Sequence, residues 1–207
     1  MKALLISDKI VENIYSNSIS DRLKDIDLII SCGDLPNYYL EFIVSTLNKP
    51  LFYVMGNHFN NGMYTENGLS TRHPEGCIDL DGKIVEFCNI VMTGFAGSMK
   101  YSNGLYQYSD SQMFLKACRL KVRLFFRKLF RKKCVDIIVT HAPPFKIHDG
   151  EDLCHRGFKV FNKLIDFCKP KFFIHGHIHL YGTGNNWKTL IGNTQVINAY
   201  GFRIIDI

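Results

Sequence analysis

Short apolar runs alternate with polar segments along the chain, and this pattern predicts an α/β fold. A continuous apolar run of about four to eight residues is typical of a strand that is buried on both faces. Between several of these runs, apolar residues recur at the spacing of a helix. We expect strands at 2–7, 27–32, 51–55, 77–80, 83–87, 90–94, 135–139 and 171–175, and two or three more at 188–206. We expect helices at 38–48, 110–132 and 156–168, and a helix or an irregular helix-like turn at 11–24.

The order of these elements predicts how they pack. Helices and strands alternate in the first and last thirds of the chain, whereas strands cluster in the middle. This order favours two packed sheets with helices on their outer sides. The dipeptide Asp81-Gly82, which separates two expected strands, predicts a hairpin turn. We find no internal repeat and no Pro- or Ser-rich linker, and therefore expect one domain over residues 1–207.

Composition and cysteine usage favour a cytoplasmic globular protein. The 207 residues are 46% hydrophobic and 21% charged, which is ordinary for a globular domain. No apolar stretch approaches the roughly 20 residues of a membrane span, and the stretch that ends at Asp8 is too short for a signal peptide. The seven cysteines are odd in number and include no Cys-x-x-Cys pair, so reduced thiols are expected. We therefore expect no transmembrane segment and a cytoplasmic location.

Five of the apolar runs end in residues that can ligate a metal ion. In open α/β sheets, ligands gather at the carboxyl ends of the strands. Carboxylates, one amide and several imidazoles are therefore directed at one region from five separate parts of the sequence. In chain order these residues are Asp8, Asp34, Asn57 with His58, His141, and His177 with His179.

The types of these residues indicate which metals and which reaction they suit. Mixed oxygen and nitrogen ligands suit Mn, Fe, Zn or Ni better than Ca or a thiolate-bound metal. The carboxylate of Asp34 has two oxygens and can bridge two ions. Two ions roughly 4 Å apart hold a hydroxide between them and stabilise the oxyanion of a reacting phosphorus ester, and a nearby imidazole can protonate the leaving alkoxide. The residues therefore predict two divalent ions and phosphoester hydrolysis.

Four motifs follow expected strands in a characteristic order. They are Gly33-Asp34, Gly56-Asn57-His58, Thr140-His141-Ala142-Pro143-Pro144 and Gly176-His177-Ile178-His179. Together with Asp8, this order resembles the calcineurin-like metallophosphoesterase family over residues 8–179. The resemblance implies a four-layer αββα sandwich and metal-dependent hydrolysis of a phosphomonoester or a phosphodiester.

The resemblance also implies a role for each motif residue. Asp34 would bridge the two ions, and His58 would contact the phosphate and protonate the leaving group. The other ligands would divide between the ions, with Asp8 and His179 on one ion and Asn57, His141 and His177 on the other.

The chain departs from the family pattern after His58, where Phe59 replaces an often acidic residue, and, with more consequence, in the first motif. The first motif of the family is Asp-x-His, whereas this chain has Asp8-Lys9-Ile10. The ion held by Asp8, Asp34 and His179 therefore lacks one imidazole. Three protein ligands are acceptable for a catalytic ion, but we expect weaker affinity at this position. The same loss leaves an alternative function open, which is a catalytically weak or inactive metal-binding scaffold for interactions on the same fold.

The loops around the motifs are the expected source of substrate contacts. The candidates are Asn57, His58, Asn60 and Tyr101, and a tyrosine could stack on a base. The sequence does not separate a phosphomonoester from a phosphodiester, and a nucleotide is one candidate among several phosphoester substrates.

One basic segment accounts for the net charge of +6. Between Lys116 and Lys133 lie nine basic residues and no acidic residue, and without them the net charge would be 6 minus 9, or −3. As a helix, the segment has an apolar side, which we expect to dock on the sheet while the basic side faces solvent. The alternative is a surface for an anionic partner, namely nucleic acid, a nucleotide substrate or an anionic membrane. The apolar side comprises Leu115, Cys118, Val122, Phe125, Phe126, Leu129 and Phe130.

Overall fold

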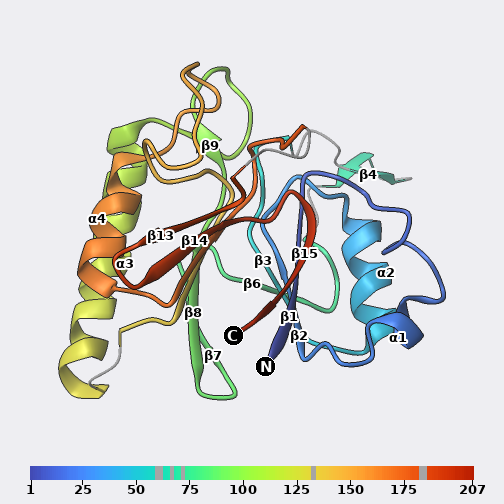
Figure 1. The fold of residues 1–207 in the computed structure, drawn as a ribbon. Helices are drawn as coiled ribbons and strands as arrows, with labels where there is room; N and C mark the ends of the chain where they lie inside the picture. The colour runs from blue at the N-terminus through green and yellow to red at the C-terminus, as the bar shows by residue number, and fades with distance from the viewer. Residues whose placement is uncertain (59–62, 66–67, 71–72, 132–133, 182–185) are drawn as a thin grey trace.

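Two β-sheets pack face to face, and helices cover the outer side of each sheet (Figure 1). The computed structural model describes residues 1–58, 63–65, 68–70, 73–131, 134–181 and 186–207. The first sheet has five strands in the order β15-β1-β2-β3-β6. Strand β15 is antiparallel to β1, and the other neighbours are parallel. The strands are β1 (Lys2–Ser7), β2 (Leu28–Ser31), β3 (Leu51–Tyr53), β6 (Cys77–Asp79) and β15 (Gly201–Asp206).

The second sheet has six strands in the order β13-β14-β12-β11-β8-β7. The four central strands are parallel, and the two edge strands are antiparallel to their neighbours. The strands are β7 (Ile84–Phe87), β8 (Ile90–Phe95), β11 (Ile137–Thr140), β12 (Phe172–His175), β13 (Lys188–Ile191) and β14 (Thr194–Asn198). Two short ladders lie outside the sheets, β4 (Met63–Thr65) with β5 (Gly68–Ser70) and β9 (Ser98–Met99) with β10 (Gln107–Tyr108).

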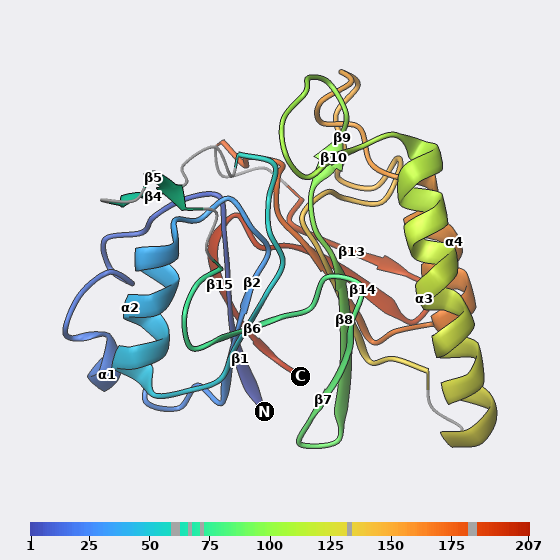
Figure 2. The ribbon, with the colours of Figure 1, turned by 180° about the vertical axis from the view of Figure 1, so that it is seen from behind.

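Helices form the outer layers on both sides of the sheets (Figure 2). On the first sheet lie α1 (Ile19–Arg22) and α2 (Asn37–Leu47), and on the second lie α3 (Asp110–Arg131) and α4 (Lys159–Cys168). The arrangement confirms the expected four-layer αββα sandwich. In the part of the chain that the structure describes, no helix is both long and apolar enough to cross a bilayer.

The central strands bury both of their faces. Ile137 and Val139 of β11 lie in the core between the sheets, whereas Ile138 lies in the core beneath α3 and α4. All three side chains are inaccessible to solvent. Because side chains alternate between the faces of a strand, a strand with two buried faces has a continuous apolar sequence. This is why such runs identified the strands that lead to the site.

Of the two forms expected for 11–24, the irregular helix-like turn is the one observed, because only the four residues of α1 are helical. In the preceding segment, polar side chains bond locally to the backbone. The Ser18 N–H donates to Ser16 Oγ at 3.4 Å, and the Arg22 guanidinium donates to the carbonyl of Asn13. Such bonds give the backbone partners other than those of a helix.

The Asp81-Gly82 dipeptide does not form the expected hairpin. Strand β6 before it pairs with β3 in the first sheet, and β7 after it pairs with β8 in the second. The chain therefore crosses between the sheets here, held by the Asp81 carboxylate, which accepts hydrogen bonds from the Ala96 N–H at 2.8 Å and Lys116 Nζ at 2.7 Å. The hairpin is the β7–β8 pair, which turns at Cys88-Asn89, where both φ angles are positive.

Helix α3 docks on the second sheet with a different side from the one we expected. The apolar side identified in the sequence faces outward, with Phe126 51% exposed and Phe130 78% exposed. The prediction was therefore wrong about which side packs on the protein. The side chains buried beneath α3 are Met113, Ala117, Leu120 and Leu124.

Two ion pairs explain the rotation of α3 about its axis. Lys116 Nζ lies 2.7 Å from the Asp81 carboxylate, and the Arg127 guanidinium lies 2.7 Å from the Glu86 carboxylate. At about 100° per residue, both cations lie beside the buried side of the helix. The acidic partners come from the crossing segment and from β7, so part of the basic side faces the protein and the larger apolar side is left in solvent.

Alanine substitutions on opposite sides of α3 should differ in their effect on stability. Leu124→Ala removes a fully buried side chain, and we expect it to lower the free energy of unfolding by about 2–5 kcal/mol. Phe130→Ala removes a mostly exposed ring, and we expect a change within about 0.5 kcal/mol. Urea denaturation followed by circular dichroism measures both. Equal losses in the two variants would mean that the outward apolar side also packs on the protein.

Candidate metal centre

The expected ligands converge at the carboxyl ends of strands from both sheets. Asp8 and Asp34 follow β1 and β2 of the first sheet, and Asn57 follows β3. From the second sheet, His141 directly follows β11, and His177 follows β12. The site therefore lies where the strand ends of the two sheets meet, as expected for a ligand site in parallel sheets.

Four polar side-chain atoms lie around one point. His141 Nε2 is 2.9 Å from Asn57 Oδ1 and 3.1 Å from His177 Nδ1. It is also 3.2 Å from Asp34 Oδ2. Atoms that bind one ion at about 2.0–2.2 Å lie about 3.0–3.5 Å from one another. The three distances from His141 Nε2 therefore match the spacing of metal ligands, and these residues fit a divalent ion.

Backbone carbonyls direct both imidazoles toward this point. His141 Nδ1 donates to the carbonyl of Cys32 at 2.7 Å, and His177 Nε2 donates to the carbonyl of Cys154 at 2.7 Å. Because a carbonyl can only accept a hydrogen bond, the opposite ring nitrogens, His141 Nε2 and His177 Nδ1, are available as ligands. Such outer hydrogen bonds are the usual means of orienting metal-binding histidines.

Opposite charges balance in this buried region. Burial opposes ionisation of Asp34, but His141 and the His58 N–H outweigh burial and hold the pKa of Asp34 well below its usual range. Burial also opposes a charge on His141, but the Asp34 carboxylate outweighs it and raises the pKa of His141 to about 9. Burial and the neighbouring His141 lower the pKa of His177 to about 3. A divalent ion would displace the proton that His141 holds in the absence of metal.

Asp8 and His179 form a second, smaller group of possible ligands. Asp8 Oδ2 accepts a hydrogen bond from the His177 N–H at 2.9 Å. Asp8 Oδ1 is buried and has no hydrogen-bond partner among the described residues, and burial raises the pKa of this carboxyl. His179 Nε2 lies 4.0 Å from Asp8 Oδ1. A buried oxygen without a partner fits a bound cation.

The backbone adopts unusual conformations where the ligands leave the strands. Asp8, Asp34 and His177 have φ angles of 62°, 54° and 66°. Residues other than glycine rarely adopt these values, and such strain is concentrated at functional sites. Gly56 is required for a different reason, because a Cβ atom at this position would overlap the Asp34 carboxylate. Local geometry and close packing therefore place the carboxylates in the site.

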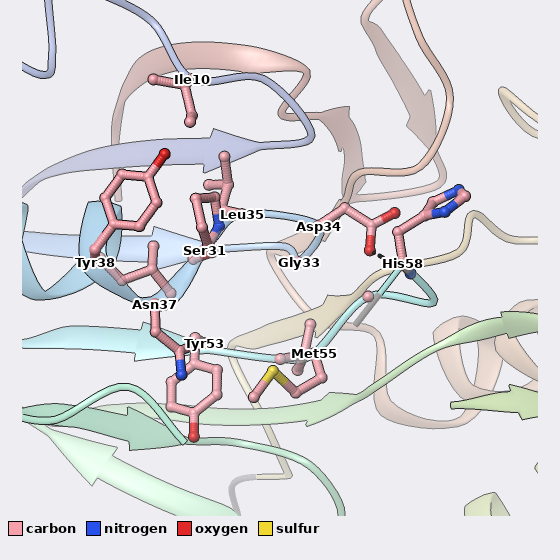
Figure 3. A pocket seen from close by; sticks show the side chains of 14 residues that line it. Ile10, Ser31, Gly33, Asp34, Leu35, Asn37, Tyr38, Tyr53, Met55 and His58 are labelled. Atoms are coloured by element: carbon pink, nitrogen blue, oxygen red, sulfur yellow. Dashed lines mark hydrogen bonds between the residues drawn. The ribbon is translucent and has the colours of Figure 1, made fainter. Parts of the chain in front are cut away.

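A cavity of 460 Å³ adjoins this centre (Figure 3). Asp34 and His58 lie side by side at one end, where the His58 N–H donates to Asp34 Oδ1 at 2.9 Å. The position that carries a histidine in the family's first motif, here Ile10, contributes an apolar side chain to the wall. Much of the remaining wall is apolar, with Leu35, Tyr38, Leu40, Val54 and Met55 among its residues.

Comparison with known families agrees with this geometry. A family model of calcineurin-like phosphoesterases matches residues 6–181, which is most of the chain. The chain belongs to this family. Membership in the calcineurin-like family supports metal-dependent phosphoester hydrolysis in general terms, and it confirms the resemblance seen in the sequence. A search among curated proteins found no match.

Several solved structures share the fold. TT1561 of Thermus thermophilus is 16% identical with a TM-score of 0.62, over 97% of this chain and 89% of that chain. Phosphopantetheinyl hydrolase from Mycobacterium tuberculosis is 10% identical with a TM-score of 0.62, over 96% of this chain and 88% of that chain. GAP50, the anchor in the inner membrane complex of Plasmodium, is 14% identical with a TM-score of 0.53, over 96% of this chain and 70% of that chain. At these identities the similarity shows a common calcineurin-like fold.

A second group of residues with metal-binding side chains lies on a neighbouring loop. Single ligand atoms of Asp152, Cys154 and His155 lie within 4.8 Å of one another. The Asp152 carboxylate accepts hydrogen bonds from His155 Nδ1 at 2.8 Å and from Cys154 Sγ at 3.0 Å. These mutual bonds account for the cluster without an ion, so the group around Asp34 is the candidate metal centre.

The structure adds positioning residues that the sequence did not identify. Cys32 and Cys154 act through backbone carbonyls, which have no signature in a side-chain motif. Tyr101, one of the expected substrate contacts, accepts a hydrogen bond from Asn57 Nδ2 at 3.0 Å, and this bond directs Asn57 Oδ1 toward the centre. Asn60, the other expected substrate contact from the loops, lies outside the described residues.

Tyr101→Phe should weaken metal binding without removing a ligand. The variant loses the hydroxyl that orients the Asn57 amide, and losses of this kind typically reduce metal affinity by about 10–100-fold. Calorimetric titration of the metal-free protein with Mn measures the effect. The matched control is Tyr15→Phe, because the ring of Tyr15 packs against the aromatic side chains of α2. Unchanged affinity in Tyr101→Phe would contradict the positioning role and leave substrate contact as the function of this tyrosine.

Proposed function

We propose that this protein hydrolyses a phosphomonoester or a phosphodiester with two divalent metal ions, drawn from Mn, Fe, Zn and Ni. The observation that carries the proposal is the convergence of Asp34, Asn57, His141 and His177 around one point. These four residues would hold one ion. Asp34 would also contact the second ion, whose other protein ligands would be Asp8 and His179. Mixed carboxylate, amide and imidazole donors suit these metals.

The residues around Asp34 are arranged to serve a phosphoryl transfer. Bound ions of this kind act as Lewis acids toward phosphoryl oxygens and activate water as the nucleophile. The two Asp34 oxygens have different neighbours, since Oδ2 faces His141 and Oδ1 accepts the His58 N–H. The second bond fixes His58 beside the centre at the end of the cavity. An imidazole in this position can give its proton to the leaving alkoxide.

The cavity beside Asp34 supports a substrate with a sizeable apolar or aromatic organic group. Its volume of 460 Å³ is in the usual range for small-molecule sites, and its wall is mostly apolar beyond Asp34 and His58. The ring of Tyr38 could stack on an aromatic group, so a nucleotide is one candidate. A compact phosphate ester without such a group would leave the apolar wall in contact with water.

Hydrolysis assays with defined metals test the proposal. We would remove metal with a chelator, add back Mn, Fe, Zn or Ni singly, and measure hydrolysis of p-nitrophenyl phosphate and bis-p-nitrophenyl phosphate. We expect turnover that depends on added metal and is lost in His141→Ala. Metal binding without turnover, for every metal and both esters, would instead support the alternative of a non-catalytic metal-binding scaffold.

Ile10→His should increase the number of tightly bound ions. In the wild-type protein the second ion would have Asp8, Asp34 and His179 as its protein ligands, and we expect purified protein to retain about one ion per chain. The new imidazole would complete the second position and raise the stoichiometry toward two. Elemental analysis after gel filtration measures this ratio. The control is Ile204→His, at an exposed isoleucine on β15. Two tight ions in the wild type, unchanged in Ile10→His, would show that Ile10 does not impair the site.

A cytoplasmic location is also part of the proposal. All seven cysteines are free thiols, which is usual in a reducing compartment. The Cys134 thiol donates a hydrogen bond to Cys168 Sγ, with the two sulfurs 3.1 Å apart. Imaging of a fluorescent fusion in the source cell checks the location directly.

A further inference from the structure

The outward side of α3 is an exposed apolar strip. Its six large side chains are each between 51% and 78% exposed. The rings of Phe126 and Phe130 stack with their centroids 6.4 Å apart, so the strip is continuous along the last turns of the helix. Exposed apolar surfaces of this kind mark interaction sites. The outer strip of α3 comprises Leu115, Val122, Phe125, Phe126, Leu129 and Phe130.

Basic side chains border the outer strip on both sides. At about 100° per residue, Lys121 and Lys128 lie along one border and Arg123 lies along the other, while Arg119 lies within the strip, two turns before Phe126. The only acidic residue among Asp110–Arg131 is Asp110 itself, at the first position of the helix. Lys116 and Arg127 form the ion pairs that fix the rotation of the helix, whereas Arg123 and Lys128 donate to the neutral backbone carbonyls of Gly82 and Phe167, which leaves their positive charge without an acidic partner in these bonds. The strip therefore lies within a strongly positive surface.

A cavity of 260 Å³ lies between α3 and α4 on the same side of the molecule. Its wall is mostly apolar, with Phe114, Ala117 and Leu164 among its residues. Two lysines, Lys121 and Lys163, also line it. An apolar cavity with two ammonium groups suits part of an amphiphile that carries a negative group.

We propose that the outer strip of α3 binds the surface of an anionic lipid bilayer. A helix with Phe and Leu along its centre and Lys and Arg along its borders lies in the bilayer interface, where the apolar side chains enter the acyl boundary. Its basic side chains reach the anionic headgroups, and each contributes to the attraction. Both features of α3, the apolar centre and the positive borders, then have a partner.

Two other occupants of the strip fit less well. A second copy of the chain would bring like charges together along both borders of the strip, which opposes association. The phosphates of a nucleic acid would pair with the cations. They would also lie against six apolar side chains, with which charged phosphates make no favourable contact. The bilayer is therefore the occupant that the charge and the apolar side chains favour together.

Binding through α3 can be tested separately from hydrolysis. Helix α3 lies on the outer side of the second sheet, whereas Asp34 lies at the strand ends, so the two surfaces share no residue (Figure 1). The proposal adds membrane recruitment to the proposed function and does not depend on it. A failed lipid experiment would leave the metal centre unaffected, and a failed hydrolysis assay would leave the outer strip unaffected.

Vesicle flotation with the full chain tests the proposal. We would compare vesicles of phosphatidylcholine with vesicles of phosphatidylcholine and phosphatidylserine in equal parts. We expect at least about tenfold tighter binding to the anionic vesicles, weakening as salt is added. Phe126→Ser with Phe130→Ser should weaken binding by about tenfold or more through lost apolar burial. Arg119→Glu with Lys121→Glu should weaken it similarly through charge.

Matched variants on other elements keep the test specific. Leu190→Ser with Ile204→Ser changes exposed apolar residues on strands, and Lys24→Glu with Lys188→Glu changes the same number of charges elsewhere. We expect both controls to bind like the wild type. Equal binding to the two vesicle types, or equal losses in the controls, would overturn the proposal.

Two further outcomes would identify a different occupant. Loss in the charge variant with full binding in the phenylalanine variant would overturn the bilayer in favour of simple polyanion adsorption, as for nucleic acid. A wild-type dimer in light scattering that the phenylalanine variant dissociates, without vesicle binding, would identify the strip as an interface between copies.

Discussion

Asp34→Asn should lower kcat/KM by at least about three orders of magnitude and reduce metal content at both positions. The substitution keeps the shape of the side chain but removes the negative charge that balances His141. It also places an amide NH₂ where a carboxylate oxygen now stands, against either His141 Nε2 or the His58 N–H. No rotation of the amide satisfies both neighbours and also offers two ligand oxygens. Steady-state kinetics and elemental analysis of the same preparations measure the two effects.

The control for Asp34→Asn is Asp25→Asn, at a carboxylate whose side chain is 70% exposed on the surface. We expect the control to match the wild type in both measurements. Circular dichroism would show that each variant is folded before its kinetics are compared. Activity within tenfold of the wild type, together with a full complement of metal, would be incompatible with a bridging role for Asp34.

The sequence was most informative where chemistry follows a buried strand. The apolar runs that precede Asp34 and His141 identify strands that are buried on both faces, and the parallel sheets then bring their ends together. The family motifs added a role for each residue. The positioning groups were not predictable, because the carbonyls of Cys32 and Cys154 approach the histidines through tertiary structure alone.

The predictions failed where the local sequence is compatible with two arrangements and contacts with residues distant in sequence select one of them. Helix α3 has apolar residues on two sides, and helical spacing alone favoured the side with more of them. Its pairing with Asp81 and Glu86 selects the other side. The same Asp81 carboxylate, through Lys116 and the Ala96 N–H, holds the crossing where a hairpin was expected. Both errors therefore have one source, a half-buried carboxylate whose partners are remote in sequence.

His58→Ala should reduce kcat by about 10²–10⁴-fold for an alkyl phosphoester while leaving metal content unchanged. The side chain is not among the three that surround His141 Nε2, whereas its backbone N–H, which alanine retains, bonds to Asp34. The metal ligands should therefore keep their places. What the variant loses is an imidazole at the end of the cavity, beside the position of a leaving group.

The leaving group provides the internal control for His58→Ala. An alkoxide needs a proton as it departs, whereas p-nitrophenolate is stable without one, so loss of a general acid should affect the alkyl ester far more than the p-nitrophenyl ester. Kinetics on both esters, with metal content measured on the same samples, give this comparison. If His58 instead only contacts the phosphate, both esters should lose the same factor, because the phosphate is common to them. An equal loss would thus assign His58 to binding, and a loss confined to the alkyl ester would assign it to proton transfer.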